Sequence, residues 1–409
     1  MSQPAEIAII GAGPAGLAAA LALAHLNIAA TVIAPAYDAI LAAADHRTTA
    51  LIGPSVTLLE NLGVWDRCCA DSSVLAGVRM ADDRQAILRV PETHFSAQEL
   101  GLVSFGANIP NAKLLAALNA TVGNATCITR LATTAVTRIE PSESSVRLCL
   151  SEGSVVTAQL VVAADGRKSI APAAAGVASR SWSYPQAALV ASFSHTRAHS
   201  GVVYELHRRT GPLTTVPLPG LHSSLVWVEE PVEARRIASL SDEDFVKLLE
   251  NQLQGVLGTI SSSGPRSLYP LAGSSTERMG ANRVAFVGEA AHVIPPIGAQ
   301  GLNLGLKDAA TLAECVADAQ AQGLDVGGHE VLEQYHRARS GDVAVRSAAI
   351  DLLNRSLLTD FLPVDVLRGA AVHALATSST LRHFLMHRGL GVTEPLPSLM
   401  RPHAPRASS

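Results

Sequence analysis

The stretch Ile7-Ala8-Ile9-Ile10-Gly11-Ala12-Gly13-Pro14-Ala15-Gly16 decides the fold of this chain. Its four aliphatic residues predict a buried strand, its glycines have G-x-G-x-x-G spacing, and an Ala- and Leu-rich helix follows to about Leu26. A strand, a glycine turn and a helix in this order are typical of a dinucleotide-binding fold. The stretch is as apolar as a secretory signal peptide, but Met1–Glu6 contains no Lys or Arg, whereas the start of a signal peptide is basic.

The glycine turn has a separate physical role for each glycine. Gly11 allows the tight turn, Gly13 lets the backbone approach a pyrophosphate, and Gly16 lets the helix pack closely on the strand. The helix begins at about Pro14 and Ala15, where free N–H groups and the positive end of the helix dipole favour an anion. The turn therefore predicts a phosphate-binding site.

The composition excludes several classes of protein. Hydrophobic residues make up 48% of the 409 residues and charged residues 16%, which indicates a globular chain of two to three domains at roughly 150 residues each. The net charge of −4 provides no positive field for nucleic acid. The five cysteines have no metal or disulfide spacing, so we expect reduced core thiols in a cytoplasmic protein and no metal. No uninterrupted apolar stretch reaches the roughly 20 residues of a membrane-spanning helix.

The second strand of the expected fold lacks its usual acid. A dinucleotide fold places an acid at the end of this strand to bind the adenosine ribose, but Thr31-Val32-Ile33 ends in Ala34-Pro35. A nucleotide bound in the usual pose must find another partner for its ribose. The motif Asp45–Leu51 follows, and its Arg47 has two interpretations, a phosphate contact or a solvated loop charge.

Two further strands end in turn residues. Leu160–Ala164 is an apolar run suited to a buried parallel strand, and Asp165-Gly166 follows it. Arg283–Val287 is another such run, followed by Gly288-Glu289. Each junction alone could be an ordinary turn.

The loop after the third junction is the most informative stretch of the chain. Pro295 and Pro296 stiffen it, while Gly298 and Gly301 lack Cβ atoms, so that the backbone can lie against a flat ring. An apolar helix begins near Gly301 and continues to about Ala319, with its positive end directed at that ring. This arrangement suits the negative charge of a reduced flavin. An ordinary helix-entry loop is the alternative, but three such junctions in order favour a flavin site.

Together these motifs resemble a known family. The order of G-x-G-x-x-G, Asp-Gly and G-acid-A-A-H-x-x-x-P is similar to the class A flavoprotein aromatic hydroxylases, which share the para-hydroxybenzoate hydroxylase fold. Pro296–Asp308 is similar more narrowly to the ubiquinone-biosynthesis ring hydroxylases, as are Asp45–Leu51, Leu62–Trp65 and Ser224–Trp227. The resemblance spans nearly the whole chain and is weakest between about residues 181 and 264.

The resemblance implies FAD and NAD(P)H as cofactors and assigns positions to them. It gives no firm catalytic acid or base. The positions that it implies are Gly11, Gly13, Pro14, Ala15 and Gly16 at the FAD pyrophosphate, Arg47 on the ADP side, Asn111 facing the cofactor, Asp165 with Gly166 serving both FAD and NAD(P)H, Gly288 and Glu289 beside the ribityl chain, and Gly298, Gln300, Gly301, Leu302 and Asn303 along the isoalloxazine.

The chain departs from the family pattern at four positions, which bear on FAD affinity and on pyridine-nucleotide contacts. Ala34 replaces the ribose-binding acid, Ala163 replaces a glycine, Pro172 stands where an arginine is common, and Glu289 replaces the usual aspartate. Because Glu289 is one methylene longer than aspartate, we expect the ribityl contact to come from the backbone.

The implied fold is α/β, with a Rossmann-like FAD-binding domain of the glutathione-reductase type, an inserted antiparallel-sheet substrate domain and a helical C-terminal segment. The FAD-binding domain would comprise residues 1–75, 100–180 and 270–340, the substrate domain 76–99 and 181–269, and the C-terminal segment 341–409. In the substrate domain, Glu205 and His207 share one strand face and Trp227 is a candidate pocket residue, although a structural role is the simpler interpretation for each.

The C-terminal segment combines apolar and basic residues. Residues 343–375 have apolar residues at helical spacing, which predicts one or two amphipathic helices. From Ser378 on, the sequence contains four arginines and one glutamate. The default interpretation is a solvated tail, and the functional one is peripheral association with an anionic inner membrane that holds a polyprenylated substrate.

The reaction implied by the resemblance is hydroxylation of a polyprenyl phenol in ubiquinone biosynthesis, with O2 and through a flavin C4a-hydroperoxide that must be shielded from water. A catabolic hydroxylase of a small phenol is one alternative. A non-catalytic scaffold that binds quinone intermediates in a biosynthetic complex is another, favoured by the missing acid at Ala34. A yellow purified protein supports either enzyme, whereas a colourless one that cannot be reconstituted with flavin supports the scaffold.

Overall fold

The computed structural model describes residues 2–82, 92–296, 300–358, 373–375, 377–390 and 395–402. Its first sheet has the order β18-β19-β11-β1-β2-β8, and all neighbours from β19 to β8 are parallel. β9 and β10 extend β11 in antiparallel order. The strands are β18 (Gly280–Ala281), β19 (Val284–Phe286), β11 (Val155–Ala163), β1 (Ser2–Ile10), β2 (Ala30–Ala34), β8 (Ile128–Ala132), β9 (Val136–Pro141) and β10 (Val146–Leu150).

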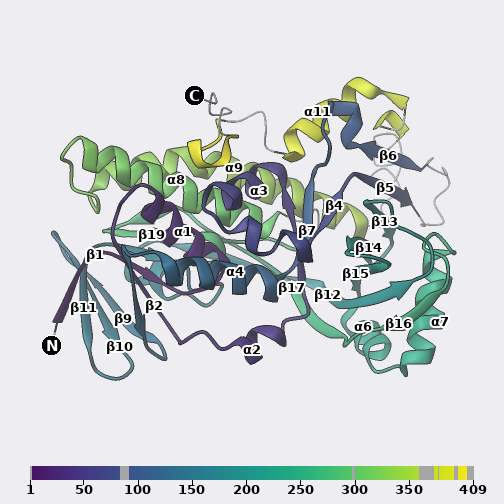
Figure 1. Ribbon diagram of the computed structural model, residues 1–409, viewed down its shortest axis with the longest axis horizontal. Helices are drawn as coiled ribbons and strands as arrows, with labels where there is room; N and C mark the ends of the chain where they lie inside the picture. Colours follow the sequence, from purple (N-terminus) through teal and green to yellow (C-terminus); the bar gives the residue numbers. More distant parts are fainter. Residues whose placement is uncertain are drawn as a thin grey trace.

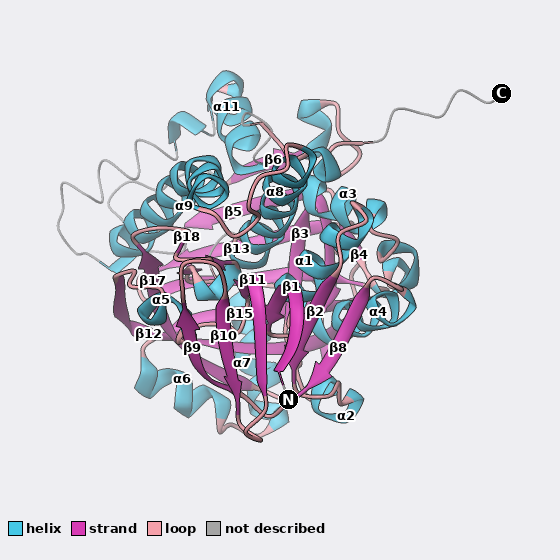
Figure 2. Ribbon diagram, turned by 90° about the vertical axis from the view of Figure 1, so that its left-hand side faces the viewer, coloured by secondary structure: helices cyan, strands magenta, loops and turns pink. Residues whose placement is uncertain are grey.

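Helix α1 lies against the central strands of this sheet and packs on further long helices (Figure 2). The helices in this region include α1 (Pro14–His25), α4 (Asn111–Asn124), α8 (Gly301–Ala321) and α9 (His329–Leu358). Every residue of α1 from Gly16 to Leu23 is buried, because α1 packs against the sheet, α4 and α8 at once. A helix covered on several sides needs apolar residues all round, which explains its Ala- and Leu-rich sequence.

The second sheet has nine strands and lies beside the first along the longest axis of the molecule (Figure 1). Its order is β20-β17-β12-β15-β14-β13-β5-β6, with β16 paired to β12, and among these pairs β13 and β5 are parallel. The strands are β20 (His292–Val293), β17 (Ser267–Thr276), β12 (Ser179–His195), β15 (His222–Glu229), β14 (Gly211–Leu218), β13 (Val202–Arg208), β5 (Gly77–Asp82), β6 (Thr93–Ser96) and β16 (Ile260–Ser263).

The two faces of the second sheet have different partners. One face packs under α6 (Pro231–Ala238) and α7 (Asp242–Leu253), where Leu189, Trp227 and Phe245 share an apolar core. The interpretation of Trp227 as a pocket residue is therefore wrong, since its ring is buried in this core. The opposite face carries Ser224, whose Oγ accepts a hydrogen bond from Thr48 Oγ1 at 2.8 Å. This face is turned toward the strand that contains Thr48.

A small third sheet joins the two large ones. β7 (Gly106–Pro110) lies between β3 (Thr48–Ile52) and β4 (Ser73–Leu75). A Cβ on Gly106 would lie 1.8 Å from the Leu51 carbonyl oxygen, so only glycine fits there. The remaining helices and helical turns are α2 (Ala39–Ala43), α3 (Gly53–Asn61), Trp65–Arg67, Cys69–Asp71, Ala97–Leu100, α5 (Ala171–Ala174), Gly288–Ala290, α11 (Ser379–Leu390) and Ser398–Met400.

This architecture confirms the α/β fold class, with a parallel sheet, an inserted antiparallel sheet and a helical C-terminal region. The domain boundaries stay a prediction; α9 runs continuously across residue 340 and contacts both β18 and β14. No helix among the described residues is long and apolar enough to cross a membrane. The cysteines are only partly core residues, since Cys68 and Cys315 are buried but Cys69 is exposed.

Candidate active site

The three strand-to-turn junctions meet at one edge of the parallel sheet. β1, β11 and β19 are adjacent and parallel, so Gly11, Asp165 and Gly288 all follow carboxyl ends of neighbouring strands. Backbone hydrogen bonds connect the turns, from Ala164 N to Ile10 O at 2.8 Å and from Val287 N to Ala163 O at 2.9 Å. Ligands of open parallel sheets bind at this edge, which makes it the candidate site.

The glycines of the first turn differ in what surrounds them. A Cβ on Gly11 would lie 2.5 Å from the Ala164 carbonyl oxygen, and one on Gly16 would lie 2.2 Å from the Gly11 carbonyl oxygen. The fold itself therefore requires Gly11 and Gly16. Apart from Gly13 and its chain neighbours, no heavy atom of the described residues lies within 4 Å of a Cβ placed on Gly13. Gly13 requires another explanation, and an open approach for a ligand supplies it.

The start of α1 is suited to an anion. No side chain caps this helix, its first turn contains no acid, and Pro14 occupies its first position. The orphan N–H groups and the positive dipole end are consequently available to a phosphate. Among the described residues, this open cradle around Gly13 fits the pyrophosphate of a dinucleotide.

The third turn packs directly on the first helix and on α8. Gly288 has φ of +62°, and a Cβ there would lie 3.3 Å from the Ala15 Cβ. A Cβ on Gly305 of α8 would lie 3.1 Å from the Gly288 Cα. Ala15, Gly288 and Gly305 therefore bring α1, the third turn and α8 close together, and the predicted positions Ala15 and Gly288 are neighbours.

Arg47 and Asn111 lie together beside β3 and β7. Arg47 donates two hydrogen bonds of 2.8 Å to Asp45, and its guanidinium carbon lies 5.2 Å from the centre of the Tyr269 ring. Asn111 Nδ2 donates to Asp45 Oδ2 at 3.2 Å, and Thr49 Oγ1 donates to Asn111 Oδ1 at 2.6 Å. Burial raises the pKa of Asp45, but the hydrogen bonds and charge of Arg47 outweigh it, so this pKa lies below its usual value. Arg47 is thus part of a polar cluster rather than an isolated loop charge.

Glu289 and Asp165 lie at the open rim of the same edge. Glu289 Oε1 accepts a hydrogen bond from Arg167 Nη2 at 3.0 Å, and both side chains are about half exposed, at 50% and 47%. Asp165 reaches solvent, but the protein around its carboxylate removes part of the hydration, which raises its pKa. A hydrogen bond with Ser169 partly offsets this rise. Arg167 was not expected from the sequence, and its place directly after the Asp-Gly turn is the signal that could have found it.

The start of α8 contains the remaining predicted positions, of which Gly298 lies outside the described residues. Gly301 is exposed, and within the part of the chain that the structure describes, its own neighbours apart, no heavy atom lies within 4 Å of a Cβ placed on it; Leu302 is half-buried. Gln300 Oε1 accepts a hydrogen bond from Arg346 at 2.7 Å. Asn303 is buried; its Oδ1 accepts from Ile52 N at 3.0 Å and its Nδ2 donates to Ala50 O at 2.9 Å. The Asn303 side chain therefore fastens α8 to β3.

The family model of the FAD binding domain matches residues 4–347. This chain belongs to that family. The ubiquinone hydroxylase UbiL of Rhodospirillum rubrum is 33% identical over 97% of this chain and 92% of its own length. The 3-demethoxyubiquinol 3-hydroxylase of Escherichia coli is 28% identical over 96% of this chain and 100% of its own length. The p-nitrophenol 4-monooxygenase PnpA of Pseudomonas putida shares the fold, with a TM-score of 0.74 and 15% identity over 95% of this chain and 98% of that one.

The resemblance to class A flavoprotein hydroxylases is thereby confirmed, and the chain is an FAD-dependent hydroxylase of this family. The acid that follows one departure, Ala34, has a structural role in this flavoprotein. Ala34 at the end of β2 is buried, and the first acid after it, Asp38, accepts hydrogen bonds from Ile40 N and Leu41 N and so caps α2. Asp38 is committed to that helix start.

Two other departures have structural settings in this flavoprotein. Ala163 is buried and pairs with Ile10 in the parallel register of β11 and β1. Pro172 is buried in the first turn of α5, where a proline is favourable. Glu289 is held by Arg167, which agrees with the expectation that its backbone, and not its carboxylate, faces the ribityl chain. That contact stays a prediction.

Proposed function

We propose that this flavoprotein uses NAD(P)H and O2 to hydroxylate the aromatic ring of a polyprenylated phenol on the route to ubiquinone. The observation that carries the proposal is the meeting of three glycine turns at one sheet edge, with Gly13 open, in a chain that matches a ubiquinone hydroxylase over 97% of its length. Bound FAD supplies hydride acceptance and oxygen activation, which no amino-acid side chain provides.

The residues of the chain hold and shield that cofactor. The uncapped start of α1 and Gly13 bind the pyrophosphate, and the cluster of Arg47 and Asn111 binds the ADP side. The start of α8 presents its positive end to the ring system. Backbone donors and a helix dipole thereby orient the cofactor.

The second sheet has apolar residues on the face that would cover the substrate. Ala188, Val228 and Leu271 form a buried apolar cluster there, separate from the core under α7. An apolar surface excludes water, and water exclusion protects reactive oxygen intermediates from decay. Glu205 and His207 lie on the face opposite the core under α7 and are joined by a 2.6 Å contact between Glu205 Oε1 and His207 Nε2. We assign no acid or base among them.

Substrate-stimulated NAD(P)H oxidation by the purified yellow protein tests this function. We expect stimulation by long-chain prenyl phenols and coupled formation of hydroxylated product, and we expect the chain to restore quinone synthesis in a strain that lacks one ring hydroxylase. Faster turnover of short soluble phenols supports the catabolic alternative instead. A colourless protein that takes up no FAD supports the scaffold and contradicts the proposal.

We also propose that the enzyme meets its substrate as a peripheral protein on an anionic membrane, within the biosynthetic complex. Leu381, Phe384 and Leu385 of α11 are exposed, and Arg388 lies over the Phe384 ring at 5.7 Å. Arg382 contributes less charge than its sequence suggests, because it pairs with Glu99 at 3.1 Å. A surface that combines exposed apolar and basic groups favours an anionic bilayer.

Liposome co-sedimentation measures this association. We expect full-length protein to bind vesicles with anionic lipid, and we expect a chain ending at Thr377 to bind them much less. Substitution of Phe384 and Leu385 by serine leaves the charge unchanged and isolates the apolar part of the surface. Equal binding by all three proteins contradicts the proposal.

A further inference from the structure

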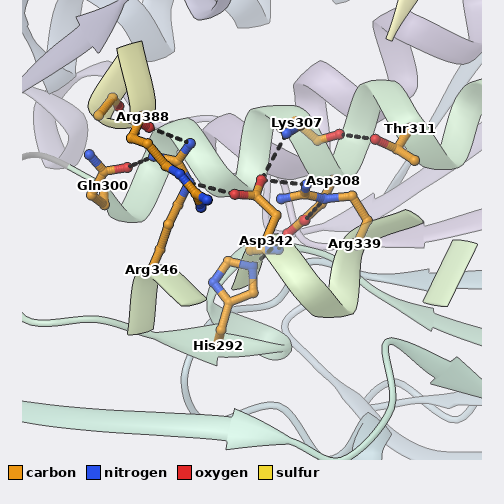
Figure 3. Close-up of polar contacts among 11 residues, drawn as sticks. His292, Gln300, Lys307, Asp308, Thr311, Arg339, Asp342, Arg346 and Arg388 are labelled. Atoms are coloured by element: carbon orange, nitrogen blue, oxygen red, sulfur yellow. Dashed lines mark hydrogen bonds and ion pairs between the residues drawn. The ribbon is translucent and has the colours of Figure 1, made fainter. Parts of the chain in front are cut away.

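A network of buried charged side chains lies between α8 and α9, outside the positions assigned to the cofactor (Figure 3). We call it the α8–α9 network, and its members are His292, Lys307, Asp308, Arg339, Asp342 and Arg346. The side chains of Asp308 and Arg339 are 0% exposed. Charges buried this deeply are costly unless they are paired, so removing one partner leaves the other as an uncompensated buried charge.

One end of the network holds the third glycine turn. Asp308 Oδ2 accepts hydrogen bonds from Gly288 N at 3.0 Å and from His292 Nε2 at 2.7 Å, and Asp308 Oδ1 accepts from Arg339 Nε at 2.7 Å. Burial raises the pKa of Asp308, but the charges of His292 and Arg339 outweigh it and hold the pKa below its usual value. An ionised Asp308 therefore fixes the Gly288 turn against α8.

The other end holds the start of α8. Arg346 donates Nη1 to Gln300 Oε1 at 2.7 Å and Nε to Asp342 Oδ1 at 2.6 Å. The same guanidinium reaches the last turn of α11, with Gly389 O at 3.2 Å and Arg388 O at 3.4 Å. Arg346 of α9 thus contacts the N-cap residue of α8 and the last turn of α11, where it caps carbonyl groups at the negative end of that helix.

A shared carboxylate connects the two ends. Asp342 Oδ2 accepts from Arg339 Nη1 and from Lys307 Nζ, each at 2.8 Å. A continuous path of ion pairs therefore runs from the Gly288 turn to Gln300. Both of these positions border the predicted flavin site, one at the ribityl chain and one at the ring.

Arg346 brings a positive charge to the start of α8. Its Nη1 contacts Gln300, the N-cap residue of the 21-residue helix α8, whose own positive end has the same sign. In a poorly solvated interior, such a charge stabilises a nearby anion more than it would in water.

We propose that the α8–α9 network positions the flavin, with Arg346 as the positioning residue at the ring, and that the positive charge of Arg346 favours the reduced, anionic cofactor. The proposal rests on the proposed function for the presence of FAD. It goes beyond the known reaction because it assigns this role to side chains of α9, a helix that contributes none of the predicted cofactor positions.

Three substitutions separate positioning from charge. Arg346→Met removes the fork and one positive charge, Arg346→Lys keeps the charge, and Asp342→Asn removes a negative charge. Arg355→Met is the matched control, because Arg355 lies on the same helix but is exposed and pairs only with Asp351 among the described residues. The measurements are the FAD dissociation constant of the apoprotein, by flavin fluorescence, and the midpoint potential of the bound flavin.

We expect Arg346→Met to weaken FAD binding about tenfold, a change of about 1.4 kcal/mol, and to lower the midpoint potential. Arg346→Lys restores the potential, Asp342→Asn raises it, and Arg355→Met changes neither property. If Asp342→Asn does not fold, Lys307→Met replaces it and must lower the potential, because it removes a cation without touching Gln300.

The two substitutions change the charge in opposite directions, so an electrostatic role requires opposite shifts of the midpoint potential. Loosened packing does not depend on the sign of the removed charge. Shifts of the potential in the same direction for Arg346→Met and Asp342→Asn therefore overturn the electrostatic role. FAD affinity within twofold of wild type for Arg346→Met overturns the positioning role. Either result leaves the proposed function intact as long as the wild-type protein binds FAD and hydroxylates a phenol. A wild-type protein that binds no FAD overturns the proposed function itself.

Discussion

The substitution Gly13→Ala separates cofactor binding from folding. Gly13 has φ of −72° and ψ of 173°, which alanine adopts without strain. Its chain neighbours apart, no heavy atom of the described residues lies within 4 Å of the added Cβ. The apoprotein should therefore be as stable as wild type or more stable by about 0.4–1 kcal/mol, because alanine restricts the unfolded chain.

The same methyl group occupies the space through which the pyrophosphate must approach α1. If the methyl group prevents one charge-assisted hydrogen bond to the pyrophosphate, FAD binding loses about 1.5–3 kcal/mol of free energy. This corresponds to roughly a 10- to 150-fold increase in the FAD dissociation constant. Gly16→Ala gives the opposite pattern. Its Cβ would lie 2.2 Å from the Gly11 carbonyl oxygen, and such overpacking destabilises the apoprotein by about 1–3 kcal/mol.

Urea unfolding of the two apoproteins, together with fluorescence titration of FAD, measures both properties. The reasoning fails if Gly13→Ala binds FAD with wild-type affinity, because the open cradle then does not face the pyrophosphate. It also fails if Gly13→Ala and Gly16→Ala destabilise the apoprotein equally.

Three further predictions concern buried groups. Asn303→Ala leaves two backbone groups of β3 without their partner and should cost about 2–3 kcal/mol in urea unfolding; an unchanged midpoint contradicts it. Asp308→Asn should lower the free energy of unfolding by about 3–5 kcal/mol at pH 7. The pKa of Asp308 is lower in the folded state than its unfolded value of about 4. The stabilisation by ionised Asp308 is therefore present above that value and is lost as the pH falls below it. The difference between wild type and this variant should thus shrink in acid unfolding. Burial raises the pKa of Cys68 to about 11 and of Cys315 to about 12, so a thiol reagent at pH 8 should label both only after denaturation.

The sequence predicted the features that depend on local pattern. The first strand, its glycine turn and the helix after it appear as β1 and α1, and the apolar runs before Asp165 and Gly288 appear as β11 and β19. These are short-range signals, since strand length, glycine spacing and helical periodicity each span fewer than about twenty residues. The meeting of three turns at one edge follows from parallel pairing, which the motif itself implies.

The interactions that the sequence did not predict join distant segments. Asn303 was expected at the flavin ring, but its side chain bonds the backbone of β3, which lies about 250 positions earlier. Trp227 was a candidate pocket residue, but the register of β15 turns it toward α7. A strand places alternate residues on opposite faces, and only the packing of the whole sheet decides which face meets the cofactor.

The missing acid at Ala34 changes how cofactor affinity is distributed over the site. Asp38 caps α2, and Glu289 accepts a hydrogen bond from Arg167. Each acid would have to give up this partner before it could bind a ribose or ribityl hydroxyl. The proposed function then assigns the affinity mainly to backbone N–H groups at α1, to the Arg47 cluster and to the turns that the α8–α9 network holds. Backbone groups bind only where the turns are fixed in place. A buried ion network that fixes two of those turns is therefore a reasonable counterpart to a site with few free side-chain ligands.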